Sequence, residues 1–157
     1  METFTSICPQ AAQVAEISLA YQPKVKISQC PKIHSSTDVY RLLLERWNRE
    51  RLEFVEEFKV LVLNRANRVL GELLLASGST VGVIIDVKLV LYTVIKSNAC
   101  SFIIAHNHPS GNLKPSEQDR RLTSKIKAAA ELMEISLLDH IIVTAEGYYS
   151  FADEGLL

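Results

Sequence analysis

Apolar and polar residues follow two different spacings along this chain, and the change between them separates expected helices from expected strands. Apolar residues recur every three or four positions where a helix is predicted, and they alternate or run together where a strand is predicted. The helices are expected at residues 36–48, 87–97 and 116–134, and the strands at residues 24–28, 54–64, 68–76, 101–105, 136–144 and 148–151. This order predicts a single-domain α/β sandwich, a mixed sheet with helices on its faces.

The start of the chain follows neither spacing, and Pro9 and Pro23 punctuate it. We interpret residues 1–35 as an N-terminal arm, partly irregular, and residues 36–157 as the folded domain. The arm has no basic region followed by an apolar core, so we expect no secretory signal. No apolar run approaches the length of a membrane span, so we expect no contact with a membrane interior.

Charge and cysteine content narrow the class of protein. The net charge of -1 provides no overall attraction to nucleic acid or to an anionic membrane. The cysteines Cys8, Cys30 and Cys100 are odd in number and far apart. This spacing argues against a disulfide framework or a structural zinc knuckle and favours a reducing, cytoplasmic location.

The stretch SFIIAHNHPSGNLKPSEQD, at residues 101–119, carries the candidate chemistry. His106 and His108 end a predicted strand two positions apart, so their side chains are expected to project together. Asp119 follows after a turn-rich loop, far enough along to fold back over them. Two imidazoles and one carboxylate match a catalytic zinc site that keeps its fourth position for water. The alternative is one core and one loop histidine with ordinary hydrogen bonds.

Ser116 and Asp119 also form an S-x-x-D pattern just before a predicted helix. The pattern is typical of a capping box, with Ser116 as N-cap and Asp119 at the third helical position. The capping role is compatible with metal binding, because it holds the carboxylate in place and leaves an oxygen available. Ser116 is alternatively a candidate donor to charge developing on a substrate oxygen.

A zinc hydrolase also needs a general base near its water. Glu56 and Glu57 lie on opposite faces of a strand that otherwise turns apolar, and Glu72 is a third candidate. Burial at a sheet edge would raise the pKa of such a carboxyl group. The alternative is that Glu56 and Glu57 are solvated charges at a strand end. His140, inside the expected strand 136–144, is interpreted as a hydrogen-bonded structural histidine and not as a fourth ligand.

The pattern H-x-H, then P-S-G, then S-x-x-D resembles the JAMM signature of the JAB/MPN-domain metalloproteins. The longer string AHNHPSGNLKPSEQD, with LLDHIIVT downstream and EEFKVLVLNRANRV upstream, resembles the RadC branch of that superfamily. The likeness covers residues 36–151. It implies a cytidine-deaminase-like α/β/α sandwich (the MPN/JAB fold) with one Zn²⁺ per chain.

The resemblance also assigns roles to residues. His106, His108 and Asp119 match the zinc ligands of the family, and Ser116 matches its motif serine. The upstream glutamate of the family activates the zinc-bound water. The RadC pattern Glu-x-Phe makes Glu56 the better match, with Glu57 as the close alternative.

Two departures from the RadC pattern concern the N-terminal arm and residues 78–88. The arm lacks the helix-hairpin-helix module that RadC proteins often carry, and residues 78–88 keep only part of the usual sequence. The missing module removes the most obvious DNA-binding element.

These observations lead to one leading hypothesis about function and two alternatives. The leading hypothesis is a JAMM-type zinc metallohydrolase that cleaves a peptide or isopeptide bond in a protein or peptide substrate. The first alternative is a nucleic-acid-associated protein, as the "DNA repair protein" label of the family suggests. The second is a non-catalytic MPN interaction module. An exposed strand edge would also allow two chains to pair as a homodimer.

Overall fold

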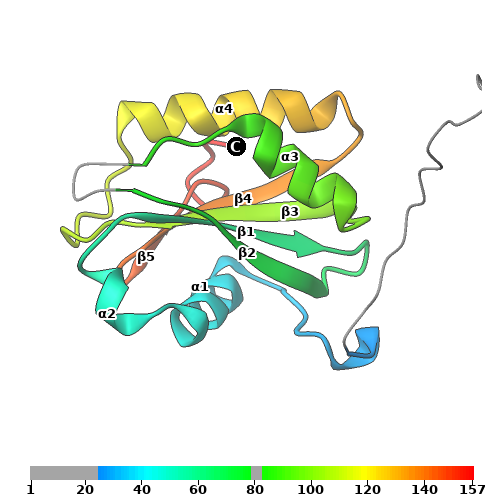
Figure 1. The fold of residues 1–157 in the computed structure, drawn as a ribbon, viewed down its shortest axis with the longest axis horizontal. Helices are drawn as coiled ribbons and strands as arrows, with labels where there is room; N and C mark the ends of the chain where they lie inside the picture. Colours follow the sequence, from blue (N-terminus) through cyan, green and yellow to red (C-terminus); the bar gives the residue numbers. More distant parts are fainter. Residues whose placement is uncertain (1–24, 79–82) are drawn as a thin grey trace, which may run out of the picture.

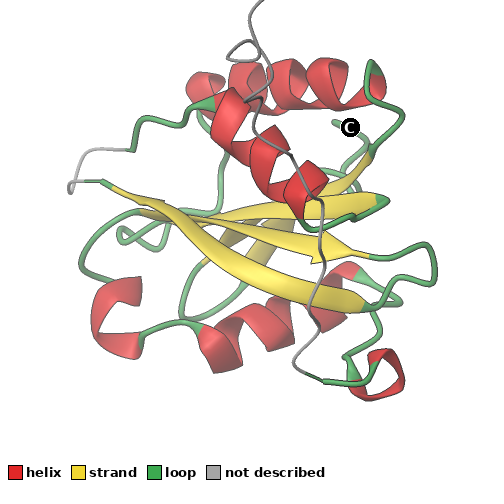
Figure 2. Cartoon of the chain, turned by 45° about the vertical axis from the view of Figure 1, so that its right-hand side comes forward, coloured by secondary structure: helices red, strands yellow, loops and turns green. Residues whose placement is uncertain are grey.

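The computed structural model of the chain describes residues 25–78 and 83–157, which form a three-layer α/β/α arrangement (Figure 1). The helices are α1 (Ser36–Arg46), α2 (Arg49–Leu52), α3 (Val87–Lys96) and α4 (Glu117–Glu131). The strands are β1 (Glu57–Leu63), β2 (Val69–Ser77), β3 (Ser101–Asn107), β4 (Ser136–Val143) and β5 (Tyr148–Ser150). Helices α1 and α2 lie on one side of the sheet, and α3 and α4 lie on the other (Figures 1 and 2).

The sheet is mixed, and its strands follow the order β2-β1-β3-β4-β5. Strand β1 pairs antiparallel with β2 and β3, β3 pairs parallel with β4, and β4 pairs antiparallel with β5. The parallel pair is joined through α4, which crosses one face of the sheet as such a connection requires. The sheet confirms the predicted single-domain α/β sandwich.

The sheet divides the hydrophobic core into two clusters, and β1 contributes to both. All of β1 is buried, which explains why its sequence is an almost continuous apolar run. Leu61 packs in the cluster that contains Leu43 of α1. Val60 packs in the cluster that contains Val90 of α3 and Ile126 of α4. The two helical layers are therefore held by alternate residues of the same strand.

The strand predicted at residues 24–28 is wrong where the structure describes it. Ile27–Gln29 form a short 3-10 helix, η2, and Lys24 lies outside the described residues. Five alternating residues do not make a strand unless a neighbouring strand pairs with them. Among the described residues, the chain forms a bridge to the sheet only after this segment, between Lys32 and Arg68. Residues 1–24 of the predicted arm lie outside the described residues. Residues 79–82, within the segment 78–88 that departs from the RadC pattern, also lie outside them.

The helix predicted at residues 36–48 is interrupted. Helix α1 ends at Arg46, and Trp47 has an extended backbone. The side chain of Asn48 then accepts a hydrogen bond from the backbone N–H of Glu50 and begins α2. This interruption directs the chain toward β1 and places residues 53–56 beside the end of β3, as the contacts of Asn107 described below show.

The remaining helices and strands lie close to their predicted ranges, with one extension that matters for the site. Strand β3 continues to Asn107, so His106 lies within the strand and His108 directly follows it. His106 is opposite Phe58 of β1 on one side and Ile142 of β4 on the other. Within the described residues, no helix is long and apolar enough to cross a lipid bilayer.

Candidate metal centre

His106, His108 and Asp119 converge at the C-terminal end of β3. The two Nε2 atoms of His106 and His108 lie 3.0 Å apart. Asp119 Oδ1 lies 3.3 Å from His106 Nε2, and Asp119 Oδ2 lies 3.8 Å from His108 Nε2. Tetrahedral zinc with bonds of about 2.0–2.1 Å would place its ligand atoms roughly 3.3 Å from one another. The structure therefore brings together the three residues that the sequence grouped, at a spacing that could hold a metal ion.

Asp119 is oriented by the start of α4. Its Oδ2 accepts hydrogen bonds from the backbone N–H of Ser116 at 2.7 Å and from the Ser116 hydroxyl at 2.6 Å. In return, the backbone N–H of Asp119 donates to Ser116 Oγ at 3.1 Å. This is the predicted capping box, and it is confirmed. Because Ser116 engages Oδ2, Oδ1 is the oxygen turned toward His106.

His108 is oriented by the loop that follows it. Its Nδ1 lies 2.5 Å from the carbonyl oxygen of Asn112, which can only accept a hydrogen bond. The neutral ring must therefore carry its proton on Nδ1 and present a lone pair on Nε2. That lone pair faces His106 and Asp119, as a metal ligand requires.

His106 is buried, with 1% of its surface exposed. Burial, opposed in part by the charge of Asp119, lowers the pKa of His106 to about 4. The imidazole is therefore neutral near pH 7 and has a lone pair available for a metal ion. Its Nδ1 lies 2.8 Å from Nε2 of His140, so the prediction that His140 is a hydrogen-bonded structural histidine is confirmed.

The three candidate glutamates have different environments. Burial raises the pKa of Glu56, while the charge of His108 lowers it and the charge of Asp119 raises it. Glu56 is thus half-buried and within electrostatic reach of the metal-site residues. Glu57 is buried and pairs with Arg51, and Glu72 pairs with Lys59 at 2.7 Å and with Arg46 at 2.6 Å. Those ion pairs give Glu57 and Glu72 a structural role.

Asn107, between the two histidines, is a residue that sequence reasoning missed. It is fully buried, and its Oδ1 accepts the backbone N–H of Glu57 at 2.7 Å. Its Nδ2 donates to the carbonyl oxygens of Leu52 at 2.7 Å and Val55 at 2.9 Å. These bonds fix the backbone on both sides of Glu56 to the strand that carries His106. The available signal was a polar residue inside a buried strand, which must find partners.

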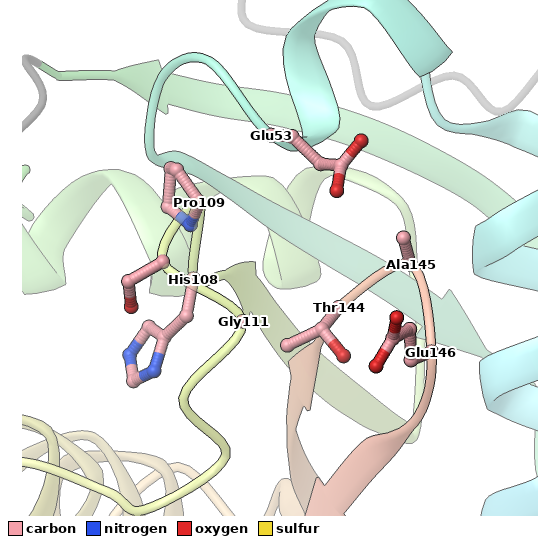
Figure 3. A pocket seen from close by; sticks show the side chains of 8 residues that line it. Glu53, His108, Pro109, Gly111, Thr144, Ala145 and Glu146 are labelled. Carbon is pink, nitrogen blue, oxygen red and sulfur yellow. The ribbon is translucent and has the colours of Figure 1, made fainter.

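A hollow of about 300 Å³ opens beside His108. Figure 3 shows His108 and Pro109 along one side and Thr144, Ala145 and Glu146, at the turn after β4, along the other. Glu53 lies at its rim, from the segment that Asn107 holds. His108 is the residue that the hollow shares with the candidate metal centre.

Fold and site together define an α/β protein with a His/His/Asp group that could hold a metal ion. A family model described as "RadC-like JAB domain" matches residues 33–156, and the chain belongs to this family. The match confirms the predicted relation to the RadC branch of the JAB/MPN superfamily.

Several curated proteins are similar to the chain over most of its length. A UPF0758 protein of Thermotoga maritima is 40% identical over 126 residues, which are 80% of this chain and 55% of the relative. A UPF0758 protein of Pasteurella multocida is 37% identical over 150 residues, which are 94% of this chain and 64% of the relative. A UPF0758 protein of Flavobacterium johnsoniae is 46% identical over 101 residues, 64% of this chain and 44% of the relative. The chain thus spans about half the length of these relatives, and their names state no activity.

Proposed function

We propose that this domain is a JAMM-type zinc metallohydrolase that cleaves peptide or isopeptide bonds. The observation that carries the proposal is the convergence of His106 Nε2, His108 Nε2 and Asp119 Oδ1, with Glu56 close enough for the charges of His108 and Asp119 to shift its pKa. Zinc suits this donor set, because two imidazoles and one carboxylate are a common catalytic zinc site with an open position. One ion would be bound per chain, by these three residues.

Each residue has a chemical task in this proposal. Bound zinc would lower the pKa of a water molecule at its open position toward neutrality and would polarise the substrate carbonyl. Glu56, with its raised pKa, would accept a proton as the water attacks the carbonyl carbon. It would then deliver the proton to the amine nitrogen as the carbon–nitrogen bond breaks. The substrate segment would lie in the hollow beside His108.

Ser116 has two tasks in the proposal. In the structure its hydroxyl donates to Asp119 Oδ2 and so fixes the carboxylate. To stabilise an oxyanion, the hydroxyl would rotate from Asp119 toward the substrate oxygen. The Ser116 backbone N–H, which also donates to Oδ2, would hold Asp119 during that exchange.

Metal content and turnover of the purified chain test this function together. We expect close to one zinc per chain, lost in the His106→Ala, His108→Ala double variant, and cleavage of some members of a peptide and isopeptide panel. Glu56→Gln should abolish cleavage and keep the zinc, because it removes the base and no ligand. Glu45→Gln is the matched control, since Glu45 is exposed on α1, across the sheet from the metal centre. Full activity of Glu56→Gln would exclude the proposed base.

The zinc and cleavage measurements, together with a nucleic-acid binding measurement, separate the alternatives. Bound zinc without cleavage of any panel member would favour a non-catalytic interaction module. A nucleic-acid-associated role predicts binding that falls steeply with added salt. The net charge of -1 gives that role no support, and absence of binding at low salt would exclude it.

The proposed setting is a reducing cytoplasm, in keeping with the free thiols of Cys30 and Cys100. A homodimer through a strand edge stays a prediction. In the described sheet the edges are β2 and β5, and β2 is the longer one. Sedimentation of the purified chain would test this pairing.

A further inference from the structure

A line of buried polar groups leaves the candidate metal centre at His106 and returns to it at Asp119. His106 Nδ1 lies 2.8 Å from His140 Nε2, and His140 Nδ1 lies 2.6 Å from Thr123 Oγ1. The Thr123 hydroxyl then donates to the backbone carbonyl of Asp119 at 2.6 Å. Thr123 and His140 therefore connect two of the three candidate metal ligands, and all four residues are buried.

The proton positions along this line follow from its last acceptor. A backbone carbonyl can only accept, so the single hydroxyl proton of Thr123 points to Asp119. Thr123 Oγ1 must then accept, and the donor is Nδ1–H of His140. A neutral His140 with its proton on Nδ1 has a lone pair on Nε2, which accepts from Nδ1–H of His106. A neutral His106 in that tautomer presents its lone pair on Nε2, toward His108 and Asp119.

We infer that Thr123 and His140 are positioning residues that hold His106 in the one neutral tautomer able to bind a metal ion through Nε2. In the other tautomer a proton on Nε2 would occupy the centre, and His106 Nδ1 would need a donor from His140. His140 would then have no proton left for Thr123, and a buried hydrogen bond would be lost. The inference rests on the proposed metal site, and it does not depend on hydrolysis.

We call the hydrogen-bonded line from His106 through His140 and Thr123 to Asp119 the relay. The aromatic neighbours of His140 keep it in place. The His140 ring stacks on Phe151, with centroids 4.6 Å apart and planes inclined by 18°. Phe58 lies on another side, with its centroid 6.1 Å away. A ring packed between two phenylalanines cannot turn its nitrogens away without opening the core. The direction of both His140 nitrogens is therefore set by packing, and their protonation by Thr123.

Metal affinity of matched threonine variants tests the relay. Thr123→Val keeps the shape of the side chain and removes the hydroxyl, whereas Thr123→Ser keeps the hydroxyl. We expect Thr123→Val to weaken Zn²⁺ binding about 10- to 100-fold in a chelator competition, the usual effect of losing a group that orients a metal ligand. Thr123→Ser should bind within about threefold of the original chain, because it keeps the hydroxyl that orients His140.

Thr93→Val is the control. Thr93 donates a hydrogen bond to the carbonyl of Leu89 one turn back in α3, as Thr123 does to Asp119 in α4. None of the hydrogen-bond partners of Thr93 in the described structure is a metal-site residue. Its loss should leave the affinity unchanged. Equal affinity of the original chain and a folded Thr123→Val variant would overturn the relay.

Nitrogen NMR of the metal-free chain provides a reading that needs no variant. The spectrum should show His106 and His140 each protonated on Nδ1 and bare on Nε2. A proton on Nε2 of either ring would overturn the inference, even if Thr123→Val failed to fold. A chain that binds no Zn²⁺ but shows these tautomers would contradict the proposed metal site and leave the hydrogen-bonded relay standing.

Discussion

The backbone N–H of Glu57 donates to Asn107 Oδ1 at 2.7 Å, which ties the segment carrying the proposed base to the strand carrying a proposed ligand. Strand β3 alternates, so His106 faces the metal centre while Asn107 faces the opposite side of the sheet. The same amide also binds the carbonyl oxygens of Leu52 and Val55. The backbone on both sides of Glu56 is therefore held to the strand that carries His106.

We predict that Asn107→Ala strongly destabilises the domain. The change leaves one backbone N–H and two carbonyl groups without their buried partner, and each such group costs about 1–3 kcal/mol. We expect a loss on the order of 3 kcal/mol or more in the free energy of unfolding, measured with urea. Asn64→Ala is the control, because Asn64 accepts two backbone hydrogen bonds in the β1–β2 turn near the surface. A loss for Asn107→Ala no larger than for Asn64→Ala would contradict the buried clamp.

The parts of the site that the sequence predicted are those governed by local rules. His106 and His108 project together because strand geometry alternates side chains, and Ser116 and Asp119 form a capping box because helix starts require one. Both rules act over a few residues, so a single sequence is enough to predict these two features.

The parts that the sequence left open depend on contacts between distant segments. Glu56 and Glu57 are neighbours in the sequence, but Glu57 pairs with Arg51 while the pKa of Glu56 is shifted by His108 and Asp119. The partner of His140 is 34 residues away from it in the chain, at His106. The strand predicted at residues 24–28 failed for the same reason, since alternation predicts which side faces inward but not whether a neighbouring strand is present.

We predict that Ser116→Ala lowers both stability and zinc affinity. The hydroxyl caps α4 and also holds Asp119 Oδ2, so its loss should cost about 1 kcal/mol of stability and should loosen a proposed metal ligand. Ser35→Ala is the matched control, because Ser35 forms an equivalent capping box with Asp38 at the start of α1, away from the metal centre. Urea unfolding should show similar losses for both variants. Chelator competition should show weaker zinc binding for Ser116→Ala alone, and equal affinities would contradict this role of Ser116.

We predict that acidification destabilises the metal-free domain between about pH 6.5 and pH 5.5. Burial lowers the pKa of His106 to about 4 and that of His140 well below its usual 6.5. Below pH 6.5 the unfolded chain therefore binds protons that the folded chain does not, so the free energy of unfolding falls as pH falls. The slope approaches about 1.4 kcal/mol per pH unit for each histidine once the unfolded imidazole is protonated.

Two carboxyl groups act in the opposite direction at lower pH. Burial raises the pKa of Glu56 and of Asp139, so their contributions to stability are present at low pH and are lost as pH rises through their folded values. Their ordinary pKa values of 4.5 and 3.8 place the start of that window well below the histidine window.

Urea unfolding in the presence of a chelator at pH 7.5, 6.5 and 5.5 should show the predicted fall in the free energy of unfolding. The His34→Gln variant should show the same fall, because His34 is exposed. A free energy of unfolding that does not change over this pH range would contradict the burial of neutral histidines.

We predict that Zn²⁺ raises the melting temperature of the metal-free chain. An ion that binds only the folded state stabilises it by about 2.7 kcal/mol at a concentration 100 times the Kd. For a domain of this size the shift corresponds to roughly 5–10 °C. His108→Ala should remove most of the shift, because it deletes the ligand whose lone pair Asn112 orients toward the centre. His34→Ala should retain the shift, since His34 is exposed and outside the cluster.

Mg²⁺ and Ca²⁺ provide the chemical control for that shift. Both ions require oxygen ligands, and a centre with two imidazoles and one carboxylate offers too few of them. At the same concentrations they should leave the melting temperature unchanged. An equal shift with Mg²⁺, or a full zinc shift in His108→Ala, would mean that metal binds elsewhere on the chain. Zinc-specific stabilisation that depends on His108 would instead tie the ion to the end of β3, as the proposed hydrolase requires.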